Sequence, residues 1–518
     1  MRLKSRLYWL IPAIILLVAI GLLFSENFKN VTEVPDEDWS RALPIGSTNI
    51  NKYPFISKTE DGAIEIVEFD DQILVKKTYG SQYNVIDEEN FPDIPFNKWT
   101  KVFSKGNDLV YFQYKTIYDG TTKKEITNAD SFHPLRDALI YLKNNVVYQL
   151  NLKTKTSEIL YTIEGEFDEL VTYQAETEEL VFLTYAKNQD KLDVSVYKHS
   201  DNLTTTIHKQ KFSISRSERV QDAALAYKDN HLAFVFKTER KGAGGSVPVN
   251  NVYLFENENK PKLNKITFND PKGANELRNI SDLSLAFENE NVKILFSAKG
   301  KSKTKYQGTT AFNIYEAVVN EEDYKIYRRS NTSDYSAKPQ WINNDTISWI
   351  DFQSEANDIL LSSSDQALIG LTKQYTGTEY IKALGKTIGM GSVAIFAILI
   401  SSMWFIWPLL LITIIYMSKR NLLDRDPTWV YYVGLISYAV AVLLFKHRFF
   451  IDTIDIKAPG YLTFQNSDLV FLLILGILAH LCASIGATQN EWNVPVRLLY
   501  FMGVHITMLA FFFGPYLI

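Results

Sequence analysis

Residues 388–417 read IGMGSVAIFAILISSMWFIWPLLLITIIYM and contain no Asp, Glu, Lys or Arg. A membrane-spanning helix needs about 20 apolar residues, so this stretch is long enough to cross a bilayer. The sequence before it is polar and rich in short strand-like segments, whereas the sequence after it is apolar and helix-like. The stretch therefore divides the chain into a large polar domain and a membrane domain.

The membrane domain is predicted to cover residues 388–518 and to contain four helices. Its transmembrane segments are predicted at 388–417, 428–446, 467–487 and 494–518. A fifth apolar run, LYWLIPAIILLVAIGLLF at 7–24, lacks a small-x-small cleavage motif at its end. Residues 1–24 are therefore interpreted as an uncleaved transmembrane signal anchor. If this helix were a cleaved signal peptide instead, the four other spans would remain.

The distribution of basic residues predicts the orientation of these helices. Cytoplasmic loops are enriched in Lys and Arg, and the basic residues before the first helix place the N-terminus in the cytoplasm. Residues 25–387 are then extracytoplasmic, and the basic pair Lys419 and Arg420 returns to the cytoplasm. Five spans place the C-terminus outside. The basic residues of the N-terminal segment are Arg2, Lys4 and Arg6.

Charge and cysteine usage limit the possible partners and the compartment. The chain has a net charge of −5, and residues 25–387 alone carry 44 basic and 53 acidic residues, a net charge of −9. This acidic balance argues against nucleic acid as a partner, because phosphate contacts require a basic face. The single cysteine, Cys482, lies in an apolar run, so the polar domain has no disulfide. A large exported domain without cysteine is typical of a bacterial cell envelope.

Residues 55–375 are predicted to form a β-propeller. Short apolar or alternating strands recur there, separated by turns rich in Asn, Asp, Gly and Lys. One unit, a turn followed by a strongly apolar strand, recurs roughly every 47 residues, within the range of propeller blades, and predicts about seven blades. A pair of all-β sandwiches is the alternative. Residues 25–54 are interpreted as a tether and residues 376–387 as a juxtamembrane linker.

The clearest repeat is AKPQWINNDTISWID at 337–351. It resembles the blade repeat of TolB-like propellers, which has a proline, an aromatic residue two positions later, a polar turn and a strand ending in aromatic-x-Asp. Pro339, Trp341 and Trp349 occupy these places, with the turn at 343–345. The resemblance implies a fold and no activity. The sequence has no G-x-S-x-G motif, so it does not extend to the serine peptidases that carry a similar propeller.

Two histidines, His480 and His505, lie inside predicted spans at similar depth on consecutive antiparallel helices. An ionisable residue within a span is a candidate functional residue, because burying it in lipid is costly. Two such histidines are able to ligate haem iron or to relay protons. The alternative is that both are structural and bond a backbone or hydroxyl group. No H-E-x-x-H motif occurs, and the sequence predicts no metal site and no cofactor.

A second candidate site is a run of alternating lysines that is able to contact a polyanion such as anionic lipid headgroups or a wall polymer. The alternative is a solvated hairpin tip. These lysines are Lys299, Lys301, Lys303 and Lys305.

These observations predict a membrane-anchored extracytoplasmic propeller that acts as a binding, sensing or scaffold module of a bacterial cell envelope. Its partners would be an envelope protein or polymer and the lipid bilayer. The alternative hypothesis is an accessory or pore-forming subunit of a membrane transporter. A lesser alternative is a haem- or metal-dependent membrane enzyme that uses His480 and His505, whereas the main prediction is that the protein is not an enzyme.

Overall fold

The computed structural model describes residues 6–52, 54–59, 62–70, 73–175, 177–240, 249–257, 260–273, 275–301, 310–320, 323–332, 335–353, 356–419 and 425–517. The chain forms two compact units. The propeller unit comprises Val34–Lys301 and Thr310–Gln374, and the helical unit comprises the chain up to Glu33 and from Tyr375 onward.

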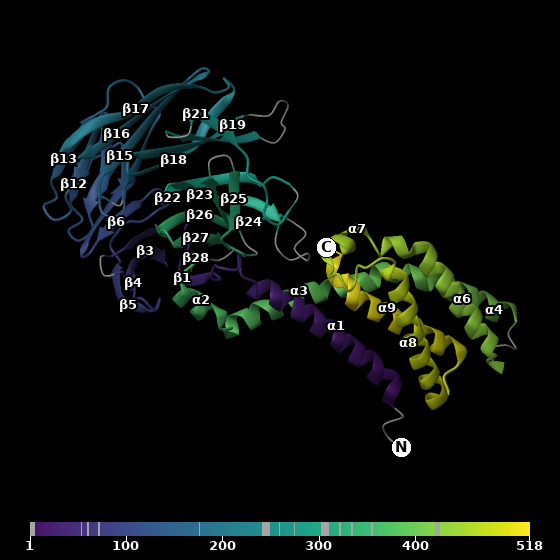
Figure 1. The fold of residues 1–518 in the computed structure, drawn as a ribbon. Coiled ribbons are helices and arrows are strands. Elements are labelled where there is room, and N and C mark those ends of the chain that lie inside the picture. Colours follow the sequence, from purple (N-terminus) through teal and green to yellow (C-terminus); the bar gives the residue numbers. More distant parts are fainter. Residues whose placement is uncertain are drawn as a thin grey trace. The chain divides into compact units, whose positions relative to one another are not determined.

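The described part of the propeller unit contains seven four-stranded antiparallel sheets (Figure 1). Three of them hold the strands from the first half of the domain. The first contains β2 (Phe55–Lys58), β3 (Ile64–Asp70), β4 (Ile73–Tyr79) and β5 (Val85–Phe91). The second contains β6 (Lys101–Lys105), β7 (Asp108–Gln113), β8 (Thr116–Asp119) and β9 (Glu125–Asn128). The third contains β10 (Ser131–Pro134), β11 (Leu139–Lys143), β12 (Val146–Leu150) and β13 (Ser157–Thr162).

Three further sheets follow in chain order. The fourth contains β14 (Glu169–Gln174), β15 (Leu180–Asn188), β16 (Lys191–Ser200) and β17 (Leu203–Ser213). The fifth contains β18 (Glu218–Lys228), β19 (His231–Arg240), β20 (Val249–Glu256) and β21 (Lys260–Ile266). The sixth contains β22 (Arg278–Glu288), β23 (Asn291–Lys301), β24 (Thr310–Asn320) and β25 (Asp323–Arg328).

The seventh sheet joins the two ends of the domain. It contains β26 (Tyr335–Asn343), β27 (Thr346–Phe352), β28 (Asn357–Ser363) and β1 (Leu43–Thr48) in the order β1-β28-β27-β26. Leu43 pairs with Leu361 and Thr48 with Asn357, so the first strand of the domain completes its last sheet. First strands of neighbouring sheets also contact each other, for example β14 with β18 and β22 with β26, and the contact of β2 with β26 closes the ring. The predicted propeller is therefore confirmed, with seven blades.

The second strand of each blade supplies most of the core between blades. In β19, the five residues from Leu232 to Phe236 are all at most 3% exposed, so both faces of this strand are covered by neighbouring blades. A strand buried on both faces appears in the sequence as an uninterrupted apolar run. This is why the recurring strongly apolar strand predicts the number of blades correctly.

Residues 25–54 differ from the predicted tether. The N-terminal helix continues through Ser25 to Thr32, and Leu43–Thr48 form β1. Trp39 is buried and donates a hydrogen bond of 2.7 Å from its ring nitrogen to the hydroxyl of Ser362. The segment is ordered because the seventh sheet needs a fourth strand, and only the residues before β2 provide it.

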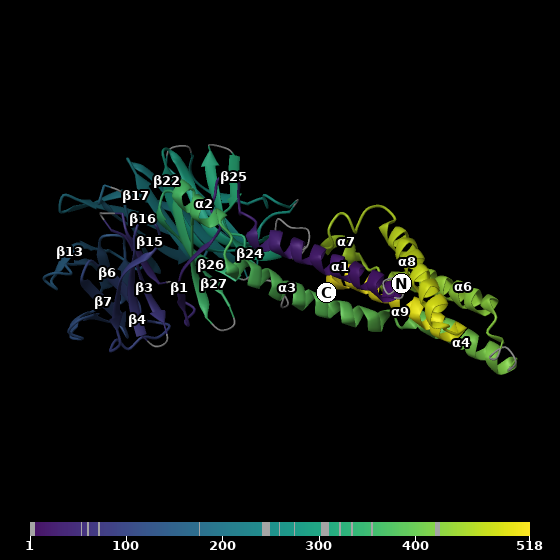
Figure 2. The same ribbon diagram turned by 90° about the horizontal axis from the view of Figure 1, so that it is seen from below.

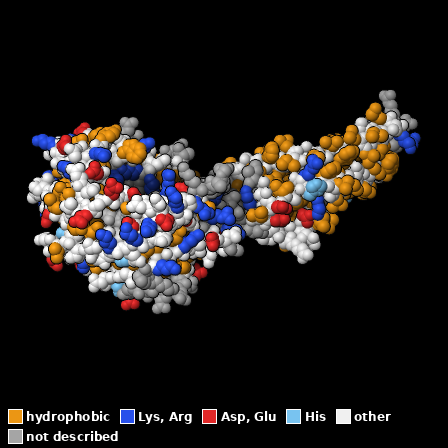
Figure 3. All heavy atoms as spheres, turned by 90° about the horizontal axis from the view of Figure 1, so that it is seen from above, with side chains coloured by type: hydrophobic (Ala, Val, Ile, Leu, Met, Phe, Trp, Pro, Cys, Tyr) orange, Lys and Arg blue, Asp and Glu red, His pale blue; other side chains and the backbone are white. Residues whose placement is uncertain are grey.

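The helical unit contains a set of long helices and shorter connecting ones (Figure 2). The helices are α1 (Leu7–Thr32), α3 (Gly377–Ser401), α4 (Met403–Ser418), α6 (Thr428–Phe445), η4 (Lys446–Arg448), α7 (Asp452–Lys457), α8 (Ser467–Asn490), α9 (Val494–Phe513) and η5 (Gly514–Tyr516). Among the described residues, five helical segments are long and apolar enough to cross a membrane. Hydrophobic side chains dominate the face of this unit shown in Figure 3. The predicted number of apolar helices is confirmed, whereas their orientation stays a prediction.

The predicted linker at 376–387 is instead the first part of α3. Thr376 and Glu379 form a capping box at its N-terminus, and α2 (Gln366–Lys373) precedes it in the propeller unit. The apolar segment Gly377–Ser418 has 42 residues and breaks only at Ser402. At 1.5 Å per residue it is about 60 Å long, roughly twice the thickness of a bilayer core. The charged residues of this segment all lie in its first part, 377–387, so this part of α3 is the one that exceeds the length needed to cross the bilayer core.

The polar start of α3 pairs with the polar end of α1, and the two helices lie side by side (Figure 2). The amide of Asn27 donates a hydrogen bond of 3.0 Å to the hydroxyl of Thr387, and both residues are buried. The rings of Phe28 and Tyr380 lie 4.7 Å apart. Part of the predicted tether and most of the predicted linker are therefore helical, and the two helices pack against each other.

The pairing of β1 with β28 leads to a test of ring closure. Ile45 is 3% exposed and packs in one cluster with Ile66 and Leu361. Ile45→Ala is expected to lower the free energy of unfolding of the propeller by about 2–5 kcal/mol, because a buried aliphatic side chain is lost. Urea unfolding followed by tryptophan fluorescence measures this. The control Leu203→Ala, at a site 63% exposed in β17, should change stability little; equal effects would contradict the role of β1.

Candidate functional site

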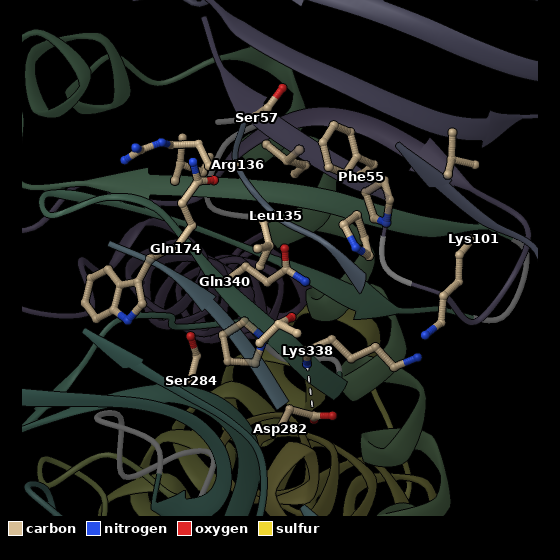
Figure 4. A pocket seen from close by; sticks show the side chains of 18 of the residues that line it. Phe55, Ser57, Lys101, Leu135, Arg136, Gln174, Asp282, Ser284, Lys338 and Gln340 are labelled. Carbon is tan, nitrogen blue, oxygen red and sulfur yellow. Dashed lines mark hydrogen bonds between the residues drawn. The ribbon is translucent and has the colours of Figure 1, made fainter. Parts of the chain in front are cut away.

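A cavity of about 1020 Å³ lies on the axis of the propeller. Residues from the first strand of every blade, or from the loops next to it, line this cavity. Figure 4 shows side chains from different blades, including Phe55, Gln174 and Gln340, around it. Ligand sites in proteins usually have volumes of about 300–1,000 Å³ and few are present per protein, so this cavity is the candidate functional site.

The wall of the cavity is irregular where two inner strands bulge. Asp282 in β22 and Lys338 in β26 have φ values of +56° and +55°, which residues other than glycine rarely adopt. The backbone amide of Lys338 donates a hydrogen bond of 3.2 Å to the carboxylate of Asp282 (Figure 4). In the same way, Leu283 donates one of 2.8 Å to Asp222 in β18. Bulges re-aim side chains and are common next to functional sites, and here they aim Lys338 into the cavity.

Three lysines from adjacent blades converge at one side of the cavity. Lys52 precedes β2, Lys101 begins β6 and Lys338 lies in β26. Figure 4 shows the side chains of Lys101 and Lys338 extending toward the same side of the cavity. Within the part of the chain that the structure describes, none of the three ammonium groups lies within 4.0 Å of a carboxylate oxygen. We call these residues the lysine triad.

Burial changes the protonation of all three lysines, and for Lys52 the charges of the other two lysines add to this effect. Burial, together with the charges of Lys101 and Lys338, lowers the pKa of Lys52 to about 7. Burial also lowers the pKa of Lys101 and that of Lys338. Nearby, burial and the charge of Lys101 lower the pKa of His133 to about 3, so this histidine is neutral at pH 7. Ionisable groups with perturbed pKa values that share one cavity make this cavity a candidate functional site.

The cavity is electropositive although the domain is acidic. Its lining residues include five basic side chains and two acidic ones, a net charge of +3. Arg136 is paired with Asp137 at 2.7 Å, so it contributes little unpaired charge. The carboxylate of Asp282 accepts hydrogen bonds from the hydroxyls of Ser281 and Ser297, at 3.2 and 3.0 Å, besides that from Lys338. The positive potential of the cavity therefore comes from the lysine triad and Lys58, and Asp282 offsets part of it.

Aromatic and aliphatic side chains form the rest of the wall, and they provide surfaces for the apolar parts of a ligand. Phe96 lies beside the triad, with the Lys52 ammonium 5.9 Å from its ring centroid. The other aromatic lining residues are Phe55, Phe69, Tyr173 and Trp341. Among the described residues, no group of three or more His, Cys, Asp and Glu side chains is placed to hold a metal ion. The cavity thus combines an electropositive side with aromatic and apolar surfaces.

The lysine triad could not be identified from the sequence alone. Each of these lysines stands alone in the sequence, and 49 and 237 residues separate consecutive members. The signal that identifies them is their position relative to the repeat, since each lies before or within the first strand of a blade. Lys338 is in fact part of the quoted repeat at 337–351, next to Pro339.

The predicted histidines lie in the helical unit and each bonds a tyrosine of α6. His480 and the hydroxyl of Tyr431 are 2.9 Å apart. His505 and the hydroxyl of Tyr438 are 2.8 Å apart, and the other ring nitrogen of His505 lies 3.1 Å from the carbonyl of Leu472. Both nitrogens of His505 are therefore occupied by protein groups, so ligation of haem iron by this residue would break a hydrogen bond.

The two histidines are not joined by direct hydrogen bonds. The ring of Phe501 is 6.5 Å from that of His480 and 6.0 Å from that of His505. Next to His480, the guanidinium of Arg497 lies 4.0 Å from the ring centroid of Tyr431 and donates a hydrogen bond of 2.8 Å to Ser484. The ring of Phe501 thus contacts both histidine rings.

The predicted polyanion site falls only partly within the described residues. Lys299 and Lys301 belong to the end of β23, where they pair with Phe312 and Thr310 of β24. The backbone amide of Lys301 donates a hydrogen bond of 2.6 Å to Asp270. Lys303 and Lys305 lie outside the described residues. A polyanion contact at these lysines stays a prediction.

No protein-family model matches the chain, and no curated protein matches it. Among solved structures, the chain is similar to a protein of unknown function from Dyadobacter fermentans DSM 18053, with 10% identity over 62% of this chain and 99% of that one and a TM-score of 0.33. It is also similar to the Trypanosoma rangeli sialidase in complex with sialic acid, with 11% identity over 64% of this chain and 58% of that one and a TM-score of 0.32.

A third similar structure is dipeptidyl peptidase 4 from Porphyromonas gingivalis, with 11% identity over 60% of this chain and 56% of that one and a TM-score of 0.31. Because the identities are low and the TM-scores lie below 0.5, we infer no activity from these proteins. The seven-bladed fold rests on the sheets of this chain itself, and nothing specific to TolB is shown.

The protonation of Lys52 is testable by its reactivity. A lysine with the ordinary pKa of about 10.4 has about one neutral amine in 2,500 at pH 7, whereas Lys52, with a pKa of about 7, is about half neutral. Pulse labelling of the full-length protein with an amine-reactive ester, read by mass spectrometry, should show the rate at Lys52 levelling off above about pH 8. In the urea-unfolded chain the rate should keep rising about tenfold per pH unit; the same rise in the folded protein would contradict the prediction.

The role of His505 is testable through the single cysteine. Cys482 is buried in α8, so a thiol-reactive dye reports unfolding of the helical unit. His505→Leu leaves the Tyr438 hydroxyl and the Leu472 carbonyl without their partner, and it should destabilise this unit by about 1–3 kcal/mol. The control is Leu473→Ala, at a site that is 65% exposed on α8, the helix that carries Cys482. If both variants unfolded at the same temperature as the wild type, the hydrogen bonds of His505 would not be structural.

Proposed function

We propose that the protein is a membrane-anchored binding module of a bacterial cell envelope, with its ligand site in the axial cavity of the propeller. The observation that carries this proposal is the cavity of about 1020 Å³, which residues of all seven blades line. A rigid ring of sheets presents such a cavity without the entropic cost of ordering loops on binding. The protein is proposed to bind rather than to catalyse.

Three further observations support the envelope and the anchoring role. The polar domain is free of cysteine, and the basic residues near the first helix favour an extracytoplasmic propeller. Five helical segments of the described chain are long and apolar enough to cross a membrane. The interior of their bundle is mostly apolar, and its histidines are held by tyrosines. The helices are therefore proposed to anchor the propeller. A transporter subunit is the alternative. The two histidines give it no support, because each bonds a tyrosine of α6 and not the other histidine.

Filling the cavity tests this function. Gln340 lies in β26 and is exposed to the cavity, so Gln340→Trp should obstruct it while leaving the blade core intact. The full-length protein is incubated with the soluble fraction released from bacterial cell envelopes, and its melting temperature is measured. A ligand that binds only the folded state raises this temperature, and at 100 times its Kd it adds about 2.7 kcal/mol.

The wild type is expected to respond to the envelope fraction, and Gln340→Trp is not. The control is Thr205→Trp, which adds the same side chain at an exposed site on β17, the outermost strand of its blade. Thr205→Trp should respond like the wild type. An unchanged response of Gln340→Trp would place the binding site outside the cavity and contradict the proposal.

A further inference from the structure

The lysine triad has hydrogen-bond donors that the protein does not use. A lysine ammonium has three N–H donors. Lys101 donates one of them to the carbonyl of Phe132 at 3.0 Å, and Lys338 donates one to the carbonyl of Asn51 at 2.8 Å. These two bonds fix the stems of the lysines and leave further donors on each ammonium group directed into the cavity.

The triad is also destabilising for the folded protein in the absence of a counter-ion. The charges of Lys101 and Lys338 disfavour the charged form of Lys52. The carboxylates of Glu169 and Asp282 act favourably on Lys101 and Lys338, but among the described residues no carboxylate oxygen lies within 4.0 Å of any of the three ammonium groups. Charges of one sign gathered without partners are retained at functional sites at the expense of stability. The described residues provide no close ion-pair partner for the triad, so its ammonium groups remain available to a negatively charged ligand.

We propose that the lysine triad of Lys52, Lys101 and Lys338 binds an oxyanion group, a phosphate or a carboxylate, of a ligand that occupies the axial cavity. This inference rests on the proposed binding function and adds the chemical class of the ligand. Lysines bind such groups as point charges, and charge-assisted hydrogen bonds are the strongest that a polar site offers. The convergence of three donors from three blades fits an anion with several oxygen atoms better than a single halide.

The remaining wall sets the size and character of the ligand. The cavity is larger than an isolated phosphate needs, and the aromatic rings of Phe96 and Trp341 line it together with polar residues such as Gln174 and Gln340. The oxyanion is therefore one group of a larger molecule whose uncharged parts contact these side chains. The positive potential of the cavity also attracts such a ligand toward a domain that is acidic elsewhere.

Isothermal titration calorimetry on the full-length protein in an uncharged detergent tests the inference. The probes are inorganic phosphate, citrate and dihexanoyl phosphatidylglycerol. All three carry an oxyanion group, and they represent a free phosphate, a carboxylate and a lipid headgroup, respectively. Lys52→Met, Lys101→Met and Lys338→Met remove one charge each and keep a similar chain length. Each is expected to weaken binding of the recognised probe about tenfold or more, and the triple variant to abolish it.

Matched variants separate binding from folding. Lys209→Met removes the same charge from an exposed position on β17 and should bind like the wild type. Lys101→Arg keeps the charge and should retain most of the affinity. Because the triad is repulsive, the Met variants should melt at the same temperature as the wild type or higher, so a loss of binding cannot be caused by unfolding.

Lysine-dependent binding of any one probe supports the inference, and the identity of that probe names the source of the oxyanion. The inference is overturned if no probe binds the wild type, or if the triple variant binds as tightly as the wild type. If the envelope fraction still stabilises the triple variant but not Gln340→Trp, the proposed binding function stands while the oxyanion site fails.

Discussion

The pairing of β1 with β28 is the contact on which the rest of the propeller depends. It joins residues more than 300 positions apart, since Leu43 lies opposite Leu361. Without it the ring would end in two unpaired strand edges, and exposed edges are sites of aggregation. Closure also fixes the inner strands against one another, because β2 contacts β26 only in a complete ring. Because the ring is closed, residues of all seven blades surround one axial cavity, and the three lysines from different blades meet in it.

Closure explains which features of this protein follow from its sequence and which do not. The central strands of the blades are buried on both faces, and this burial gives the apolar runs that predict seven blades, for example at His231–Arg240. β1 could not be identified in the same way. It is an outer strand with a proline and a glycine, LPIGST, and its partner is at the other end of the domain. Lys52 and Lys338 are likewise far apart in sequence, 286 positions from each other.

The two kinds of candidate residue differ in how far local sequence could identify them. His480 and His505 stand out because they are ionisable residues in apolar runs, yet the structure gives each a tyrosine partner from α6. Lys52, Lys101 and Lys338 look like ordinary strand-end residues, and only the ring brings them together. The local sequence thus identified two histidines that are hydrogen-bonded to tyrosines. The lysine triad could not be identified in this way, because only the closed ring of blades brings its members together.

The helical pair of α1 and α3 has a consequence for the architecture of the whole chain. Asn27 and Thr387 are bonded side by side although the entire propeller lies between them in sequence. The propeller is therefore an insertion within an antiparallel helical hairpin, and its two ends leave from neighbouring strands of one blade. Such an insertion is able to be exchanged for another domain with close ends while the hairpin keeps its contacts. The helical unit is, in this sense, a platform into which the propeller has been inserted.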